Sequence, residues 1–315
     1  MATVKVIRKR IASVKNTQKI TKAMKMVSAA KLRRAQNRLI QSRPYAQSLH
    51  RIISHLVHLT EKAPHPIFVP HKNEFGEDEV KKINFLILTS DRGLCGGFNG
   101  NLLRRVEAFI AEKTTSLQSV PDAKVSLSVV GRKGRDYFRA RKREPDEIVP
   151  TTDIGETVPF ETIFGMTQTL IEDYQSRKFD EYYVVYNYFR SAISQEVKIE
   201  RILPWIPESV SEEADGNTMD DSTLKSGTYL PEYVYEPSKE ELLQTLIPKA
   251  LATRLRQAFL ESIAGEYAAR MVAMDNATNN SADMIQALTL QMNRLRQAAI
   301  TKELMDIVNG AESLK

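Results

Sequence analysis

Histidine is the residue type most often found in metal sites and acid–base chemistry, and all five histidines of this chain fall within 22 residues. They are His50, His55, His58, His65 and His71. Only His55 and His58 have the spacing that places two side chains on one helix face, and three prolines separate His58 from His71. The pattern favours polar residues at a helix end and in a loop, with a metal cluster as the alternative.

A glycine-rich segment at residues 90–100 lies between a strand pattern and a helix pattern, where α/β folds bind phosphate. Its sequence, SDRGLCGGFNG, matches neither G-x-G-x-x-G nor a phosphate loop that ends in G-K-[ST]. We therefore expect Gly93, Gly96 and Gly97 to form a structural turn without a cofactor, and nucleotide binding is the alternative.

Other patterns of reactive residues do not occur in the sequence. The single cysteine, Cys95, allows neither a disulfide nor a cysteine-rich zinc site within the chain. The sequence contains no G-x-S-x-G, H-E-x-x-H, C-x-x-C or kinase motif. We therefore expect no catalytic residues, no metal site and no cofactor.

The 315 residues are 42% hydrophobic and 27% charged, which is ordinary for a folded protein. The charges, however, are distributed unevenly along the chain. The first 60 residues contain 14 Lys or Arg and no acid, so this arm needs an acidic partner: nucleic acid, a protein surface or anionic lipid. No apolar run approaches the roughly 18–20 residues that span a bilayer, and the start lacks a signal peptide's apolar core. We expect a soluble, unexported protein that meets a membrane only through partners.

A long helix is expected at each end of the chain. Residues 2–43 contain neither Gly nor Pro, so a helix over residues 1–60, with Pro44 absorbed, would be about 90 Å long. Residues 238–312 form the second helix, with Ser238 as its N-cap. Both helices carry apolar residues at alternating spacings of three and four, which predicts that they pair as an antiparallel coiled coil. The alternatives are core helices of a large bundle or two separate dimerisation coiled coils.

The seam positions follow from this spacing. In the first helix they are Val4, Ile7, Ile11, Val14, Gln18, Thr21, Lys25, Ser28, Leu32, Ala35, Leu39 and Ser42. In the second they are Met271, Met274, Thr278, Ser281, Ile285, Leu288, Met292, Leu295 and Ala299. A neighbouring stripe through Ile20, Met24 and Val27 predicts that the buried face drifts around the first helix. After Ala299 the apolar positions shift to Ile300, Leu304 and Ile307, so the tip is expected to face another partner.

The middle of the chain, residues 80–206, predicts a Rossmann-like α/β domain with a mainly parallel sheet, because strand and helix patterns alternate. The expected strands cover residues 82–90, 124–131, 180–189 and 194–204. The expected helices cover residues 101–113 and 159–178, with another helix after the strand at 124–131. Residues 207–237 contain eight acids and one lysine, which predicts an exposed loop or insertion.

Three segments resemble the ATP synthase gamma family of bacteria. They are IRKRIASVKNTQKITKAMKMVSAAKLRRAQ near the start, TSDRGLCGGFN in the middle, and GEYAARMVAMDNATNNSADMI followed by RQAAITKELMDIVNGA at the end. Together they cover about a quarter of the chain in the family's order. The resemblance implies a non-catalytic rotor shaft of the central stalk, which couples ion-driven rotation to ATP synthesis at the beta subunits.

The same resemblance implies partners and coupling residues. The partners are three alpha and three beta subunits around the shaft, with an epsilon subunit and the membrane c-ring at its foot, on the cytoplasmic face of the inner membrane. Coupling contacts with the ring are implied for Lys22, Met24, Lys25, Arg296, Gln297, Thr301 and Glu303. The alternatives are a nucleic-acid-binding coiled coil with a basic arm and, less favoured, a nucleotide-dependent enzyme.

Overall fold

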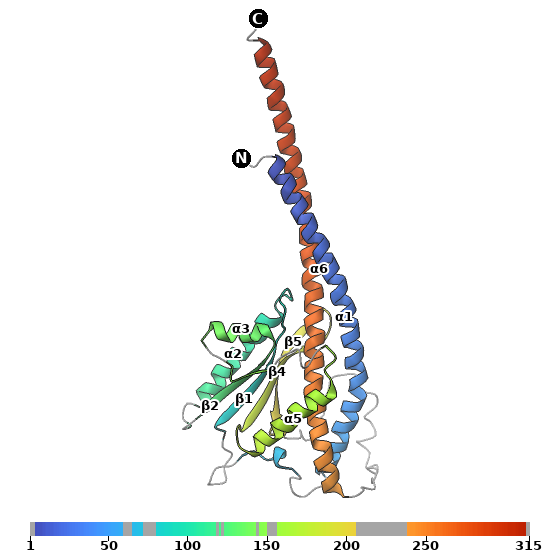
Figure 1. Cartoon of the computed structure of the whole chain (residues 1–315), viewed down its shortest axis with the longest axis vertical. Helices are drawn as coiled ribbons and strands as arrows, with labels where there is room; N and C mark the ends of the chain where they lie inside the picture. Colours follow the sequence, from blue (N-terminus) through green and yellow to red (C-terminus); the bar gives the residue numbers. More distant parts are fainter. Residues whose placement is uncertain are drawn as a thin grey trace, which may run out of the picture.

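The structure is a computed structural model that describes residues 4–58, 65–71, 80–117, 120, 123–142, 145–149, 156–205 and 238–312. Two long helices form a shaft, and an α/β domain, the foot, lies beside the lower half of that shaft (Figure 1). The predicted acidic segment, residues 207–237, lies outside the described residues.

The shaft pairs α1 (Val4–His58) with α6 (Lys239–Glu312). The helices run antiparallel, since both chain ends lie at the same end of the shaft (Figure 1). Ser238 caps α6 as predicted, because its Oγ accepts a hydrogen bond of 3.2 Å from the backbone N–H of Glu241. Pro44 and Pro248 lie inside the helices without ending them.

The predicted seam of α1 is confirmed, since every one of its positions is buried or half-buried. Ile7 and Ile11 pack on Leu288 of α6 near the top. The predicted drift of the buried face is wrong, because Ile20 is 60% exposed and Val27 is 56% exposed. A helix that supercoils around its partner keeps the 3.5-residue period of its seam on that partner, so the neighbouring stripe stays outside.

The foot contains one five-stranded sheet in the order β3-β2-β1-β4-β5. The strands are β1 (Lys82–Leu88), β2 (Lys124–Val130), β3 (Glu147–Val149), β4 (Glu181–Phe189) and β5 (Gln195–Leu203). β1 to β4 pair in parallel and β5 pairs antiparallel with β4. The fold class predicted from sequence, a coiled coil joined to a mainly parallel α/β domain, is confirmed.

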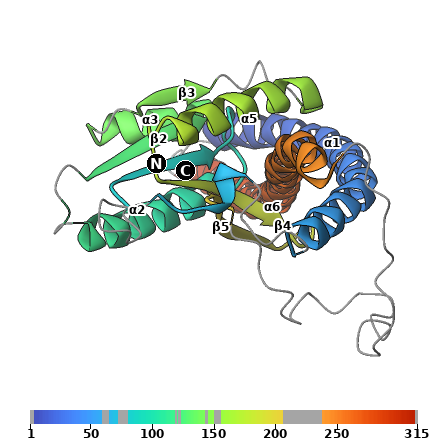
Figure 2. The ribbon, with the colours of Figure 1, turned by 90° about the horizontal axis from the view of Figure 1, so that it is seen from below.

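The two faces of the sheet belong to different cores. Helices α2 (Phe98–Ser116) and α3 (Arg132–Ala140) cover the face onto which Ile83, Phe85 and Ile87 point. α5 (Phe160–Gln175), the short helix η1 (Pro66–Phe68) and the shaft cover the opposite face (Figure 2). The lower shaft is therefore one wall of the larger core, and the foot cannot turn independently of α6 without breaking that core.

Candidate functional site

The residues predicted to make coupling contacts form two clusters on the shaft. The first, in the middle of α1, contains Lys22, Met24 and Lys25. The second, near the end of α6, contains Arg296, Gln297, Thr301 and Glu303. Lys25 lies level with Asp275, from which Arg296 is about 30 Å further along α6. The structure therefore does not bring the clusters together but places them at two heights of one shaft.

The first cluster is partly engaged within the shaft. Lys25 Nζ donates to Asp275 Oδ1 of α6 at 2.6 Å, and both side chains are about two-fifths exposed (40% and 42%). Met24 is half-buried, whereas Lys22 is exposed. Lys25 thus links the two helices, and Lys22 presents its positive charge outward.

All four residues of the second cluster are exposed. The last packed layers of the shaft join Ile7 and Ile11 of α1 to Leu288, with Met292 and Leu295 beside them. Above these layers α6 continues alone, without α1 beside it (Figure 1). The tip, residues 296–312, therefore offers every face to a partner.

The tip also carries large exposed apolar side chains. These are Ile300, Leu304, Met305, Ile307 and Val308, which are 49%, 57%, 56%, 68% and 54% exposed. The shift of apolar positions in the sequence predicted three of them, whereas Met305 and Val308 were missed although they lie in the same run. Apolar side chains gathered on an unpaired helix indicate an interaction surface.

The glycine-rich loop is held by contacts from inside the chain. The side chain of Asn99 accepts from the backbone N–H of Ser90 at 3.0 Å and donates to Ser90 Oγ at 2.7 Å. From α6, Arg270 donates to the carbonyl oxygens of Arg92 and Gly93 at 3.1 and 3.3 Å. The loop thus docks the carboxyl edge of the sheet on the shaft.

The crevice where Rossmann-like sheets usually bind a nucleotide lies at the carboxyl ends of β1 and β4. Here α6 packs along β4 and adjoins that edge. Glu261 of α6 accepts from the backbone N–H of Phe189, the last residue of β4, at 3.4 Å. Asn187 of β4 in turn donates to the Phe98 carbonyl at 3.5 Å. The carboxyl end of β4 is thus packed against α6 and the start of α2.

The histidines lie near the lower end of the molecule. His65 Nδ1 accepts from the Ile67 N–H, and burial lowers the pKa of His65, which favours this neutral acceptor form. His71 pairs with Asp180 at 2.8 Å. His50 stacks on Trp205, and the side chains of His55 and His58 lie outside the described residues. Within the described part of the chain no three metal-binding side chains come together.

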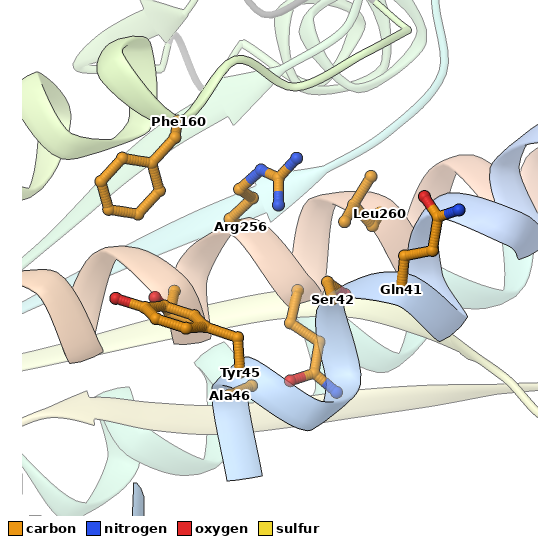
Figure 3. A pocket seen from close by; sticks show the side chains of 9 residues that line it. Gln41, Ser42, Tyr45, Ala46, Phe160, Arg256 and Leu260 are labelled. Carbon is orange, nitrogen blue, oxygen red and sulfur yellow. The ribbon is translucent and has the colours of Figure 1, made fainter. Parts of the chain in front are cut away.

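A cavity of about 200 Å³ opens where α1, α6 and the start of α5 meet (Figure 3). Phe160 and Arg256 line one side, and Ser42 and Tyr45 of α1 line the other. Arg256 Nε donates to the Val158 carbonyl at 2.8 Å, so its guanidinium is held by the foot. None of the predicted coupling residues lines this cavity.

Comparison with known proteins assigns the chain to a family. A family model described as ATP synthase matches residues 3–314. A protein of Geobacter metallireducens named ATP synthase gamma chain is 42% identical over 315 residues, which is 100% of both chains. This chain belongs to the ATP synthase gamma chain family. A gamma chain of Desulfitobacterium hafniense is also 42% identical, over 316 residues and 100% of both chains.

Solved central stalks share the fold. A chain of the Tetrahymena thermophila mitochondrial ATP synthase central stalk and c-ring is 26% identical, with a TM-score of 0.53 over 82% of this chain and 99% of that one. A chain of the Euglena gracilis enzyme is 19% identical, with a TM-score of 0.61 over 99% and 94% of the two chains. Family and fold together give this gamma chain the role of a rotor shaft in ATP synthase, as predicted from its sequence. No helix in the described ranges is long and apolar enough to cross a membrane.

Proposed function

We propose that this gamma chain is the non-catalytic central shaft of the enzyme, which turns inside a ring of three alpha and three beta subunits. The foot would contact an epsilon subunit and the membrane c-ring, so that the chain is peripheral, on the cytoplasmic face of the bacterial inner membrane. Catalytic residues then belong to the beta subunits, which bind ADP and phosphate and release ATP as the asymmetric shaft turns.

The observation that carries this proposal is the unpaired tip of α6. Five large apolar side chains are about half exposed there, directly after the exposed Arg296 and Gln297. A single helix with such a surface is stable only when partners cover it from several sides. A ring of subunits closed around the tip supplies that cover.

The basic arm supports a second contact at a lower height. Most lysines and arginines of α1 above the foot are exposed, and Lys22 lies among them. A rotating basic surface attracts each acidic loop that it passes in turn. Because salt screens this attraction over about 8 Å at physiological ionic strength, it acts only on loops that lie close to the shaft. We therefore assign Lys22, Met24 and Lys25 to contacts with the lower rim of the ring.

We assign Arg296, Gln297, Thr301 and Glu303 to coupling contacts at the tip. Guanidinium and amide groups can bind a facing carboxylate or carbonyl in one rotational state and release it in the next. Such contacts change which state of a beta subunit is favoured only if their strength differs between states.

The test is reconstitution with alpha and beta subunits from the same source. We expect one copy of this chain per three alpha and three beta subunits, and ATP hydrolysis that depends on it. Arg296→Ala or Gln297→Ala should lower hydrolysis, whereas Arg139→Ala, which removes an exposed arginine from the foot, should not. Failure to join the ring, together with salt-sensitive binding to duplex DNA, would instead support the nucleic-acid alternative.

A further inference from the structure

The two shaft helices are attached to the foot in different ways. α6 packs directly on β4 and α5, whereas α1 packs mainly on α6. Over its lower half, from Leu32 to Leu56, α1 contributes buried side chains to the core that contains Trp205. An apolar seam resists separation of two helices, but it offers little resistance to sliding. Torque applied at the foot therefore reaches α6 directly, and it reaches the upper part of α1 through polar contacts between the helices, such as Lys25–Asp275, or through a direct connection from the foot.

Residues 156–160, which lead into α5, make that connection. Lys31 Nζ of α1 donates to the Glu156 carboxylate, and Arg38 Nη1 donates to the Glu156 carbonyl oxygen at 2.8 Å. Lys31 and Arg38 are two helical turns apart, so they lie on one face of α1. One residue of the foot thus engages α1 at two successive points.

The same segment is fixed on α6. Tyr267 of α6 lies beside the Lys31–Glu156 pair, with Lys31 Nζ 5.3 Å from the centroid of its ring, and Arg256 of α6 holds the Val158 carbonyl at 2.8 Å. Val158 is fully buried and has a φ of 49°, a conformation that a β-branched residue adopts only when its surroundings impose it. Glu156 is therefore presented by a segment that is itself held against both helices.

We propose that Glu156, through its contacts with Lys31 and Arg38, fixes α1 to the foot, so that torque is carried by both helices of the shaft. We call this set of contacts the pin. This inference rests on the proposed shaft function. The contacts of Glu156 with Lys31 and Arg38 lie at the upper end of the apolar stretch of α1 that runs from Leu32 to Leu56. A directional polar contact at this end adds to the apolar packing below it, and together they prevent α1 from slipping around α6 when the foot is driven.

The chain offers a matched control. Glu107 of α2 is also an acid that pairs with a cation, Arg141 at 3.1 Å, and accepts from a tyrosine, Tyr137 at 2.7 Å. All three of these residues belong to the foot. Glu107→Gln therefore removes an equivalent set of interactions without touching the shaft.

The experiment uses complete ATP synthase in vesicles, with this chain as its gamma subunit. Glu156→Gln should lower the equilibrium constant for the contact between Glu156 and α1 about two- to five-fold, which is the range for one partly exposed ion pair. Protons pumped per ATP hydrolysed should fall, and a probe on the foot should show larger angular fluctuations when the ring is held still. Hydrolysis by the complex without membrane subunits should stay unchanged, because its foot carries no load.

Three variants separate a pin from a general loss of structure. Glu156→Asp keeps the charge and should restore part of the pumping ratio, and Lys31→Gln should reproduce the Glu156→Gln result from the helix side. Glu107→Gln should match wild type in every readout. The proposal is disproved if the wild-type enzyme pumps protons but Glu156→Gln and Lys31→Gln show the same pumping ratio and the same angular fluctuations as Glu107→Gln. A wild-type chain that never joins the ring would overturn the shaft function instead.

Discussion

A buried carboxyl group in the shaft gives a pH-dependent prediction. Glu261 of α6 is 1% exposed, and burial raises its pKa from 4.5 to about 7. Gln257, the Phe189 N–H, Lys198 and Arg43 oppose this shift without cancelling it. Between pH 4.5 and 7 the native chain therefore binds more protons at this site than the unfolded chain, so stability falls as pH rises through that window.

The expected magnitude follows from the shift. A difference of this size corresponds to about 3 kcal/mol of unfolding free energy lost above pH 7. Glu261→Gln removes the charge and keeps the shape, so it should stabilise the chain by about 1–3 kcal/mol at pH 8 and by little at pH 5. Urea unfolding of the wild type and of Glu261→Gln at both pH values measures this difference in the free energy of unfolding.

Glu200→Gln provides the comparison with the opposite sign. Glu200 accepts from Arg254 Nε and Nη2 at 2.9 and 2.7 Å, so losing its charge leaves a half-buried arginine without its carboxylate. We expect that variant to lose about 1–2 kcal/mol at pH 8. The reasoning is refuted if Glu261→Gln has the same effect at pH 5 and pH 8, or if it destabilises the chain at pH 8.

Two further predictions concern the foot and its junction with the shaft. Gly131 has a φ of 91°, and a Cβ there would lie 2.2 Å from the Thr89 carbonyl oxygen, so Gly131→Ala should lower the free energy of unfolding by about 3 kcal/mol or more. Gly100 has open space around it, so Gly100→Ala should raise the free energy of urea unfolding by about 0.5–1 kcal/mol. Arg270→Ala should lower the free energy of unfolding by about 2–4 kcal/mol, because it frees the glycine-rich loop and leaves Glu266 without its 2.7 Å ion pair. An unchanged free energy of urea unfolding would contradict this.

The sequence predicted the shaft well because its signals are long and repeated. Residues 2–43, which contain no Gly or Pro, and a seam of alternating spacing leave few alternatives to a helix pair. The error at Ile20 and Val27 arose because a straight helix was assumed, whereas α1 follows its partner. β3 was missed because three residues, Glu147–Val149, carry no periodicity, and their strand exists only through pairing with β2.

The candidate site was less accessible from sequence. Glu156 lies in no recognisable local pattern, and its importance appears only when folding brings it to Lys31, Arg38 and Tyr267. The contacts proposed for Arg296 and Gln297 are with partner surfaces, so the chain alone assigns them no contact. Their roles follow from the family resemblance and stay predictions.

The middle of the shaft seam indicates what the helix pair is built for. Apolar layers lie at both ends, but between them Thr278 donates to Thr21 at 2.8 Å, and Ser28 and Ser281 are buried. Small hydroxyl side chains contribute less to association than leucine, yet a paired hydroxyl fixes which residues lie opposite each other. A shaft enclosed by a ring does not need its own helices to bind tightly, since the ring prevents them from separating. It does need them to keep one register under torque, and the polar layers and the pin at Glu156 both serve that requirement.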